Sequence, residues 1–164
     1  LLIGLAGGII SSQIIALYEG QLRIDPSMAF FMPLIAATAG NVGVQSSAIV
    51  VQGLASGSLA NVQLLTRMWK ELRVALVTAV VCGVVIFAIN FALEQSQALT
   101  YTVSIALFTV IITAAMFGTV IPLPMDRLKV DPALATGPFV TTLNDIFGLL
   151  TYFSVGRLMY GMLS

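Results

Sequence analysis

The stretch MAFFMPLIAATAGNVGVQSSAIVVQGLA, residues Met28 to Ala55, contains no charged side chain. A helix rises about 1.5 Å per residue and the hydrocarbon core of a bilayer is about 30 Å thick, so about 20 apolar residues can cross it. This stretch is longer than that, although Pro33, Gly40 and Gly43 interrupt it. It predicts a membrane-spanning helix.

The composition of the whole chain also indicates an integral membrane protein. Hydrophobic residues make up 59% of the 164 residues, and charged residues make up 9%. A soluble domain carries about 25% charged residues, because its surface must be hydrated. The seven basic and seven acidic residues cancel, so nothing indicates a nucleic acid as partner, and the lipid bilayer is the expected environment.

Four further apolar runs predict four further spans. We expect Pro122 and Pro124 to stop the fourth span, and Asp131-Pro132 to begin the fifth. The fold class is therefore predicted to be all-α, integral to the membrane, with a bundle of five transmembrane helices. The predicted spans cover residues 1–18, 28–55, 74–93, 99–121 and 132–155.

Basic residues predict the orientation of these spans. The loops after the second and fourth spans carry three and two Lys or Arg residues, whereas those after the first and third carry one and none. Arg67, Lys70 and Arg73 lie at helical spacing beside Trp69, which predicts a short interfacial helix before the third span. Because basic loops stay in the cytoplasm, we expect a multi-pass protein of the cell (inner) membrane, with the N-terminus cytoplasmic and the C-terminus outside.

Asp145 is the only ionisable residue well inside a predicted span. A carboxylate at the bilayer centre costs about 2.5–3.5 kcal/mol on insertion scales, so such residues face a water-filled cavity, an ion path or a partner charge. No Lys or Arg lies within a predicted span, since Arg157 is more than three helical turns further on. A permeating cation would supply the missing charge. The alternative is a protonated Asp145 that is hydrogen-bonded within the bundle.

The neighbours of Asp145 offer further oxygen ligands. Thr141 lies one turn earlier on the same helical face, and Gly137-Pro138 lies about two turns earlier, where it can free backbone carbonyls. Such a set suits a hard cation such as magnesium or calcium. Sodium or protons would also fit by chemistry alone.

The second span has a polar face of its own. Thr38, Asn41 and Gln45 recur at spacings of three and four residues, beside a face of small residues. These side chains could contribute uncharged oxygens to a cation site. The alternative is that they serve only helix packing and interhelical hydrogen bonds.

Enzymatic readings find little support in the residues. An intramembrane aspartyl protease needs two carboxylates in adjacent spans, and only Asp145 is placed for that role. The chain has no histidine to act as a general base, and no glycine-rich phosphate loop. We therefore expect a protein that is not an enzyme.

Two motifs resemble a known family. The run from Pro33, PLIAATAGNVGVQSSAIVVQGLASG, resembles the second transmembrane helix of the bacterial MgtE magnesium channels. Asp131-Pro132-Ala133, followed by Gly137-Pro138 and Asp145, resembles the last helix of that family. The similarity extends over essentially the whole chain, including the basic loop between the second and third spans.

The resemblance implies a homodimer whose pore follows the twofold axis and is lined by the second and fifth helices of both subunits. Asp145 would recognise a largely hydrated Mg²⁺, because this ion sheds its waters reluctantly. Backbone carbonyls near Thr141 and Gly137 and the amide of Asn41 would complete the metal site. Gln52 and Gly137 depart from the family pattern, so the transported ions could include cobalt and related divalent cations.

The resemblance also implies cytoplasmic regulatory domains, a helical N domain and paired CBS modules, which are absent from this chain. We expect a fragment, since the chain begins Leu-Leu-Ile, and we expect the segment 67–73 to face the cytoplasm and meet those domains. Two other functions remain open. One is a secondary exchanger that couples Mg²⁺ to Na⁺ or H⁺, although five spans do not divide into two equal inverted repeats. The other is a membrane scaffold that transports nothing.

Overall fold

The structure, a computed structural model, describes residues 1–57, 64–129 and 137–163. These residues contain helices and no strand. The helices are α1 (Leu2–Leu17), α2 (Glu19–Ile24), α3 (Met28–Ala55), α4 (Leu64–Ala92), α5 (Gln97–Val120), α6 (Pro122–Arg127) and α7 (Pro138–Leu163).

Four segments are long and apolar enough to cross a membrane: Met28–Ala55, Leu65–Ala92, Gln97–Asp126 and Pro138–Leu163. They correspond to the second to fifth predicted spans. The helix Leu2–Leu17 is also apolar but has 16 residues, which extend about 24 Å at 1.5 Å per residue. A first span at residues 1–18 therefore stays a prediction, whereas four spanning helices are supported.

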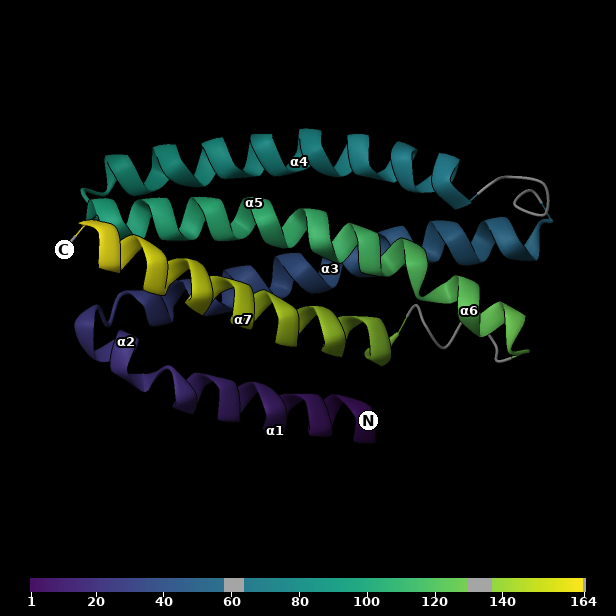
Figure 1. Ribbon diagram of the computed structural model, residues 1–164, viewed down its shortest axis with the longest axis horizontal. Helices are drawn as coiled ribbons and strands as arrows, with labels where there is room; N and C mark the ends of the chain where they lie inside the picture. Colours follow the sequence, from purple (N-terminus) through teal and green to yellow (C-terminus); the bar gives the residue numbers. More distant parts are fainter. Residues whose placement is uncertain (58–63, 130–136, 164) are drawn as a thin grey trace.

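The long helices lie side by side in a bundle (Figure 1). α5 packs against α3, α4 and α7, and α1 packs against α7. The interior is filled by apolar side chains from several helices, and the same helices are apolar on their outer sides too, as helices that span a membrane are. The largest fully buried side chains include Tyr152, Phe153, Met28, Ile35, Leu99 and Ile111.

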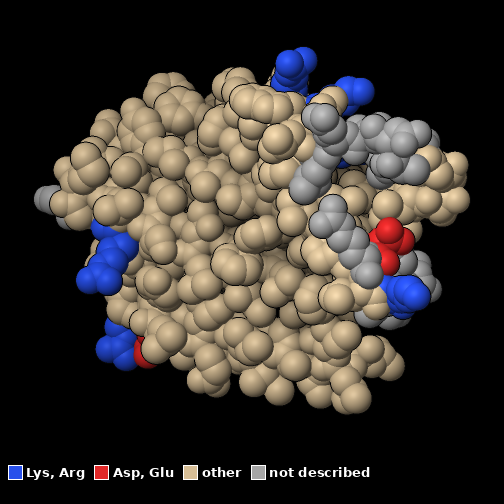
Figure 2. Space-filling view, turned by 45° about the vertical axis from the view of Figure 1, so that its right-hand side comes forward, with Lys and Arg blue, Asp and Glu red and all other residues tan. Residues whose placement is uncertain are grey.

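The outer surface of the bundle is apolar between two charged ends. On α4, Val77, Val81 and Val84 are more than half exposed, which would be unfavourable in water but suits a lipid-facing helix. In Figure 2, the Lys, Arg, Asp and Glu side chains gather at opposite ends of the visible face, and uncharged residues cover the area between them. This distribution supports a multi-pass membrane protein.

The third span differs from the expectation at its beginning. A short interfacial helix was expected between residues 56 and 73, but α4 runs without interruption from Leu64 to Ala92. Residues 64–73 contain no Gly or Pro and are rich in Leu, Arg, Lys and Glu, which favour helix. The basic residues therefore extend the spanning helix itself.

The fourth span does not simply stop at its prolines. α5 ends at Val120, and a short helix, α6, begins at Pro122. A proline is tolerated at the first position of a helix, because its missing N–H would have no partner there. The expected start of the fifth span, Asp131-Pro132, lies outside the described residues. The described helix α7 begins at Pro138 and continues past residue 155 to Leu163.

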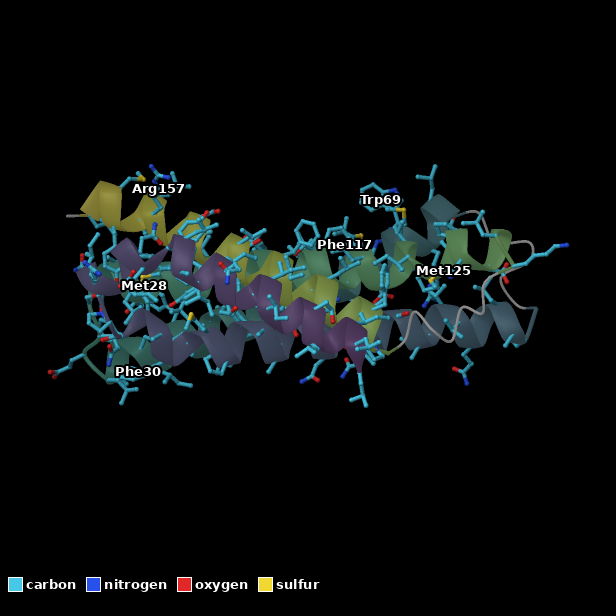
Figure 3. The ribbon with its side chains drawn as sticks, turned by 90° about the horizontal axis from the view of Figure 1, so that it is seen from below. Met28, Phe30, Trp69, Phe117, Met125 and Arg157 are labelled. Carbon is cyan, nitrogen blue, oxygen red and sulfur yellow. The ribbon has the colours of Figure 1, made fainter. Side chains whose placement is uncertain are left out.

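Hydrogen bonds around Asp25 join three elements at one end of the bundle. The backbone N–H of Ser27 donates to Asp25 Oδ1 at 2.9 Å, and the Tyr160 hydroxyl of α7 donates to Asp25 Oδ2 at 2.6 Å. The Ser96 hydroxyl, at the N-cap of α5, donates to Asp25 Oδ2 at 3.3 Å. In Figure 3, Met28 and Arg157 lie at this end and Trp69 lies at the other.

Candidate cation site

Asp145 is the eighth of the 26 residues of α7, on the side of that helix that faces α3. It is half-buried and lines a cavity of about 430 Å³ together with Thr141 of the preceding turn. The rest of the lining comes from one face of α3: Ala36, Ala37, Gly40, Asn41, Val44 and Gln45. The fold therefore joins two segments that are about 100 residues apart in the sequence.

Three of the four residues predicted to hold the metal line this cavity: Asp145, Thr141 and Asn41. The fourth, Gly137, lines an adjoining cavity of about 570 Å³ between α1 and α7, which Asp145 and Thr141 also line. Gln45 lies in the first cavity, as its spacing from Asn41 suggested, but Thr38 is not among the lining residues.

The Gly137 carbonyl is occupied rather than free. The backbone N–H and the hydroxyl of Thr141 both donate to Gly137 O, each at 3.4 Å. Both hydrogen bonds are longer than the usual 2.7–3.2 Å and therefore weak. A ligand could take over this carbonyl at small cost, because little is lost when such long bonds break.

Gly40 allows the close approach of α3 to the carboxylate. A Cβ added at Gly40 would lie 3.1 Å from Thr141 Cγ2 and 3.4 Å from Asp145 Oδ1. An alanine at this position would require Thr141 to shift by a few tenths of an ångström, whereas its contact with Asp145 would be ordinary. The small residue therefore keeps the acidic group within reach of the polar face of α3.

Asp145 has no ion-pair partner in the part of the chain that the structure describes. Among the described residues, the ion pairs are Arg23–Glu19 and Arg67–Glu71, so neither includes Asp145. The same residues contain no group of three or more His, Cys, Asp or Glu side chains that could hold a metal. The described residues thus place a single carboxylate at this cavity with neutral oxygens around it, an arrangement that can attract a cation but not enclose it.

Asn144 is a buried polar residue beside the site that the sequence did not single out. It is 1% exposed, and neither its Nδ2 nor its Oδ1 has a hydrogen-bond partner in the described part of the chain. Its amide packs on Gly43 of α3, where a Cβ would collide with it. Its position next to Asp145 in the sequence could have indicated a role at the site. Only its contact with Gly43 shows that it packs on α3 and does not line the cavity.

Comparisons with known proteins agree with these observations. The family model MgtE, described as a divalent cation transporter, matches residues 32–155. Three curated relatives are each named magnesium transporter MgtE: those of Bacillus subtilis (38% identical over 148 residues), Enterococcus faecalis (33% over 151) and Thermus thermophilus (31% over 152). The alignments cover 90%, 92% and 93% of this chain and 33%, 33% and 34% of the relatives. The chain therefore spans about a third of the length of the curated relatives it matches.

Proposed function

This chain belongs to the MgtE family of divalent cation transporters, and we propose that its cargo is Mg²⁺, carried across a cell membrane. The names of the three relatives support magnesium as the ion. The family is one of transporters, in agreement with the expectation that the chain is not an enzyme. The observation that carries the proposal is the cavity in which Asp145 faces the polar side of α3.

The ion is recognised with most of its water shell in place. Mg²⁺ dehydrates reluctantly and usually keeps several waters. Six waters occupy roughly 180 Å³, taking about 30 Å³ for each, and the cavity of about 430 Å³ has room for them. Asp145 attracts the ion, while Asn41, Gln45 and Thr141 hydrogen-bond to its waters.

The working form is a homodimer with the ion path between the subunits, lined by α3 and α7 of each. Two features support this. Asn41 and Gln45 are exposed on α3, and amides on a spanning helix are costly to leave against lipid. One carboxylate also leaves a divalent cation half neutralised, whereas Asp145 from two copies would balance its charge.

The basic end of the bundle faces the cytoplasm. Arg67, Lys70 and Arg73 lie in the first part of α4, at the end that Trp69 and Met125 mark in Figure 3. The excess of basic residues there supports a cytoplasmic location, with the C-terminus outside. In a longer chain, regulatory domains would meet this end.

Ion uptake into proteoliposomes tests the proposal, with wild type compared with Asp145→Asn. We expect the wild type to transport Mg²⁺, and we expect Na⁺ to inhibit this flux weakly and Co²⁺ to inhibit it more strongly. The flux of the variant should be at background, because the amide keeps the shape of the side chain and removes its charge. Flux that requires an opposing Na⁺ or H⁺ gradient would indicate an exchanger. Magnesium flux that Asp145→Asn leaves unchanged would place the ion path elsewhere, and an absence of any ion-dependent signal in wild type would favour a scaffold.

A further inference from the structure

A second carboxylate lies within the spanning helices, on α4. Glu71 is 9% exposed, and its Oε1 accepts a hydrogen bond of 2.6 Å from the Ser46 hydroxyl of α3. Its Oε2 lies 3.8 Å from Nη2 of Arg67, one turn earlier on α4. A hydrogen bond to a carboxylate is stronger than one between neutral groups, especially where water is excluded.

Ser46 is adjacent in sequence to Gln45, which lines the cation cavity. Consecutive residues of a helix point about 100° apart, since 3.6 residues complete a turn. The Ser46 hydroxyl therefore points away from the cavity toward α4, while Gln45 points into it. Both side chains must move together when α3 slides or rotates.

The same part of α3 is also closely packed against α5 and α7. Gly118 of α5 lies against the Gly43 carbonyl, and a Cβ added to Gly118 would lie 2.9 Å from Ser46 Cβ. Asn144 of α7 packs on the Cβ position of Gly43. Because α4 packs mainly against α5, the hydrogen bond from Ser46 to Glu71 adds a polar link between α4 and the helix that lines the cavity.

Arg67 completes the group. Its Nε is buried and has no hydrogen-bond partner among the described residues, so the guanidinium interacts there chiefly with the Glu71 carboxylate. At 3.8 Å the two side chains form an ion pair without a hydrogen bond, so Arg67 balances the charge of Glu71 while the hydrogen bond to Ser46 orients the carboxylate.

We propose that Glu71 is a positioning residue for the cation site: through Ser46, it sets the depth and rotation of α3 and so the distance of Asn41 and Gln45 from Asp145. The inference rests on the proposed function, since it assigns a role in divalent-cation recognition to a group outside the cavity. Glu71 does not touch the ion. It acts on the geometry of the groups that do.

The test compares Ser46→Ala with Ser47→Ala in the full chain. The two changes remove the same atom from neighbouring buried serines, but the hydroxyl of Ser47 has no partner in the described part of the structure. Two readouts are measured: the Mg²⁺ concentration that gives half-maximal flux, and the one that gives half-maximal thermal stabilisation. We expect Ser46→Ala to raise both by roughly two- to thirtyfold, the range for substitutions within a coupling network, with a smaller change in maximal flux. Ser47→Ala should leave both near wild type.

A second pair of variants separates positioning from folding. Glu71→Gln keeps an oxygen that can accept from Ser46, and should restore most of the Mg²⁺ dependence that Glu71→Ala loses. The double variant Ser46→Ala/Glu71→Ala should have the same half-saturation as Glu71→Ala alone, because Glu71→Ala has already removed the hydrogen bond to Ser46. If Glu71→Ala does not fold, the serine pair still decides.

Equal half-saturation values for Ser46→Ala and Ser47→Ala would overturn the inference. It would also be overturned if Glu71→Ala folds and Glu71→Gln needs as much Mg²⁺ for half-saturation as Glu71→Ala does. Wild-type protein that neither binds nor transports Mg²⁺, or does so independently of Asp145, would instead refute the proposed function, and this inference with it.

Discussion

Asp25 is a loop residue whose carboxylate holds one end of the bundle together. It accepts hydrogen bonds from Tyr160 of α7, from the Ser96 hydroxyl and from the backbone N–H of Ser27. Burial alone would raise the pKa of Asp25, but the hydrogen bonds from Tyr160, Ser27 and Ser96 outweigh it and hold the pKa below its usual 3.8. The ionised form is therefore the one that the fold stabilises.

The lowered pKa predicts how stability depends on pH. A carboxyl whose pKa is lower in the folded than in the unfolded state stabilises the fold above the unfolded pKa of about 3.9, and this contribution is lost as pH falls through the folded value. We expect the melting temperature of purified wild type to fall below about pH 4, and the Asp25→Asn variant to show a flatter profile with a lower value near neutrality. Thermal unfolding recorded between about pH 6 and pH 3 measures both.

The matched control is Glu19→Gln, which removes a carboxylate from the exposed ion pair with Arg23. Exposed ion pairs contribute little to stability, so the melting temperature of Glu19→Gln should depend on pH as that of the wild type does. A steep acid transition that persists unchanged in Asp25→Asn would assign the pH dependence to another group.

At the scale of the helices, small residues decide how closely the elements approach. Gly118 on α5 lies against the backbone carbonyl of Gly43 on α3, and Gly40 leaves room for Thr141 and Asp145. Gly83 on α4 is different, because a Cβ there would meet the Ser104 carbonyl at 3.7 Å, an ordinary contact. Gly118, Gly40 and Gly83 look alike in the sequence and differ in what they face.

This difference predicts opposite effects of the same substitution. Gly118→Ala should destabilise the protein by about 1–3 kcal/mol, as overpacking does, because a backbone carbonyl cannot move aside as a side chain can. Gly83→Ala should be neutral or stabilising by about 0.5–1 kcal/mol, the helix preference of Ala over Gly. Urea or thermal unfolding of the two variants measures the contrast, and equal stabilities would show that α3 and α5 are not in contact at Gly118.

At the scale of the whole molecule, the face shown in Figure 2 has an apolar band between two charged ends. One end carries the basic residues of α4, including the exposed Lys70, and the other carries the exposed Arg23. The four long helices run between these ends (Figure 1). A bilayer matches this shape, since its core solvates the exposed valines of α4 and its interfaces solvate the charges.

The proposed orientation predicts which end reacts from which side. In a Cys82→Ser background, we expect Lys70→Cys to react with a membrane-impermeant maleimide only when the reagent reaches the cytoplasmic face. Arg23→Cys should react only from outside. The reverse pattern would invert the proposed topology, and labelling of both cysteines from one side would show that these residues do not lie at opposite faces.

Some features of this protein follow from the sequence alone. Uncharged runs longer than a bilayer is thick predict spanning helices wherever they occur, because the cost of burying a charge in lipid is a local property of the chain. The same reasoning singled out Asp145, since an acidic residue deep in such a run requires a partner of opposite charge or a water-filled ion path. Four of the predicted spans follow from these patterns, whereas the family was inferred from the resemblance of two motifs, the run from Pro33 and the one from Asp131 to Asp145, and the family model confirms it.

Tertiary structure alone determined how the helices face one another. Periodicity offered Thr38, Asn41 and Gln45 as equivalent members of one polar face, yet only Asn41 and Gln45 line the cavity with Asp145. It gave no sign that Glu71 reaches Ser46, 25 positions earlier in the chain, or that Asn144 packs on Gly43. Hydropathy determines that a segment enters the membrane, but its rotation and its neighbours depend on how side chains from distant segments fit together, and that fit exists only in the assembled bundle.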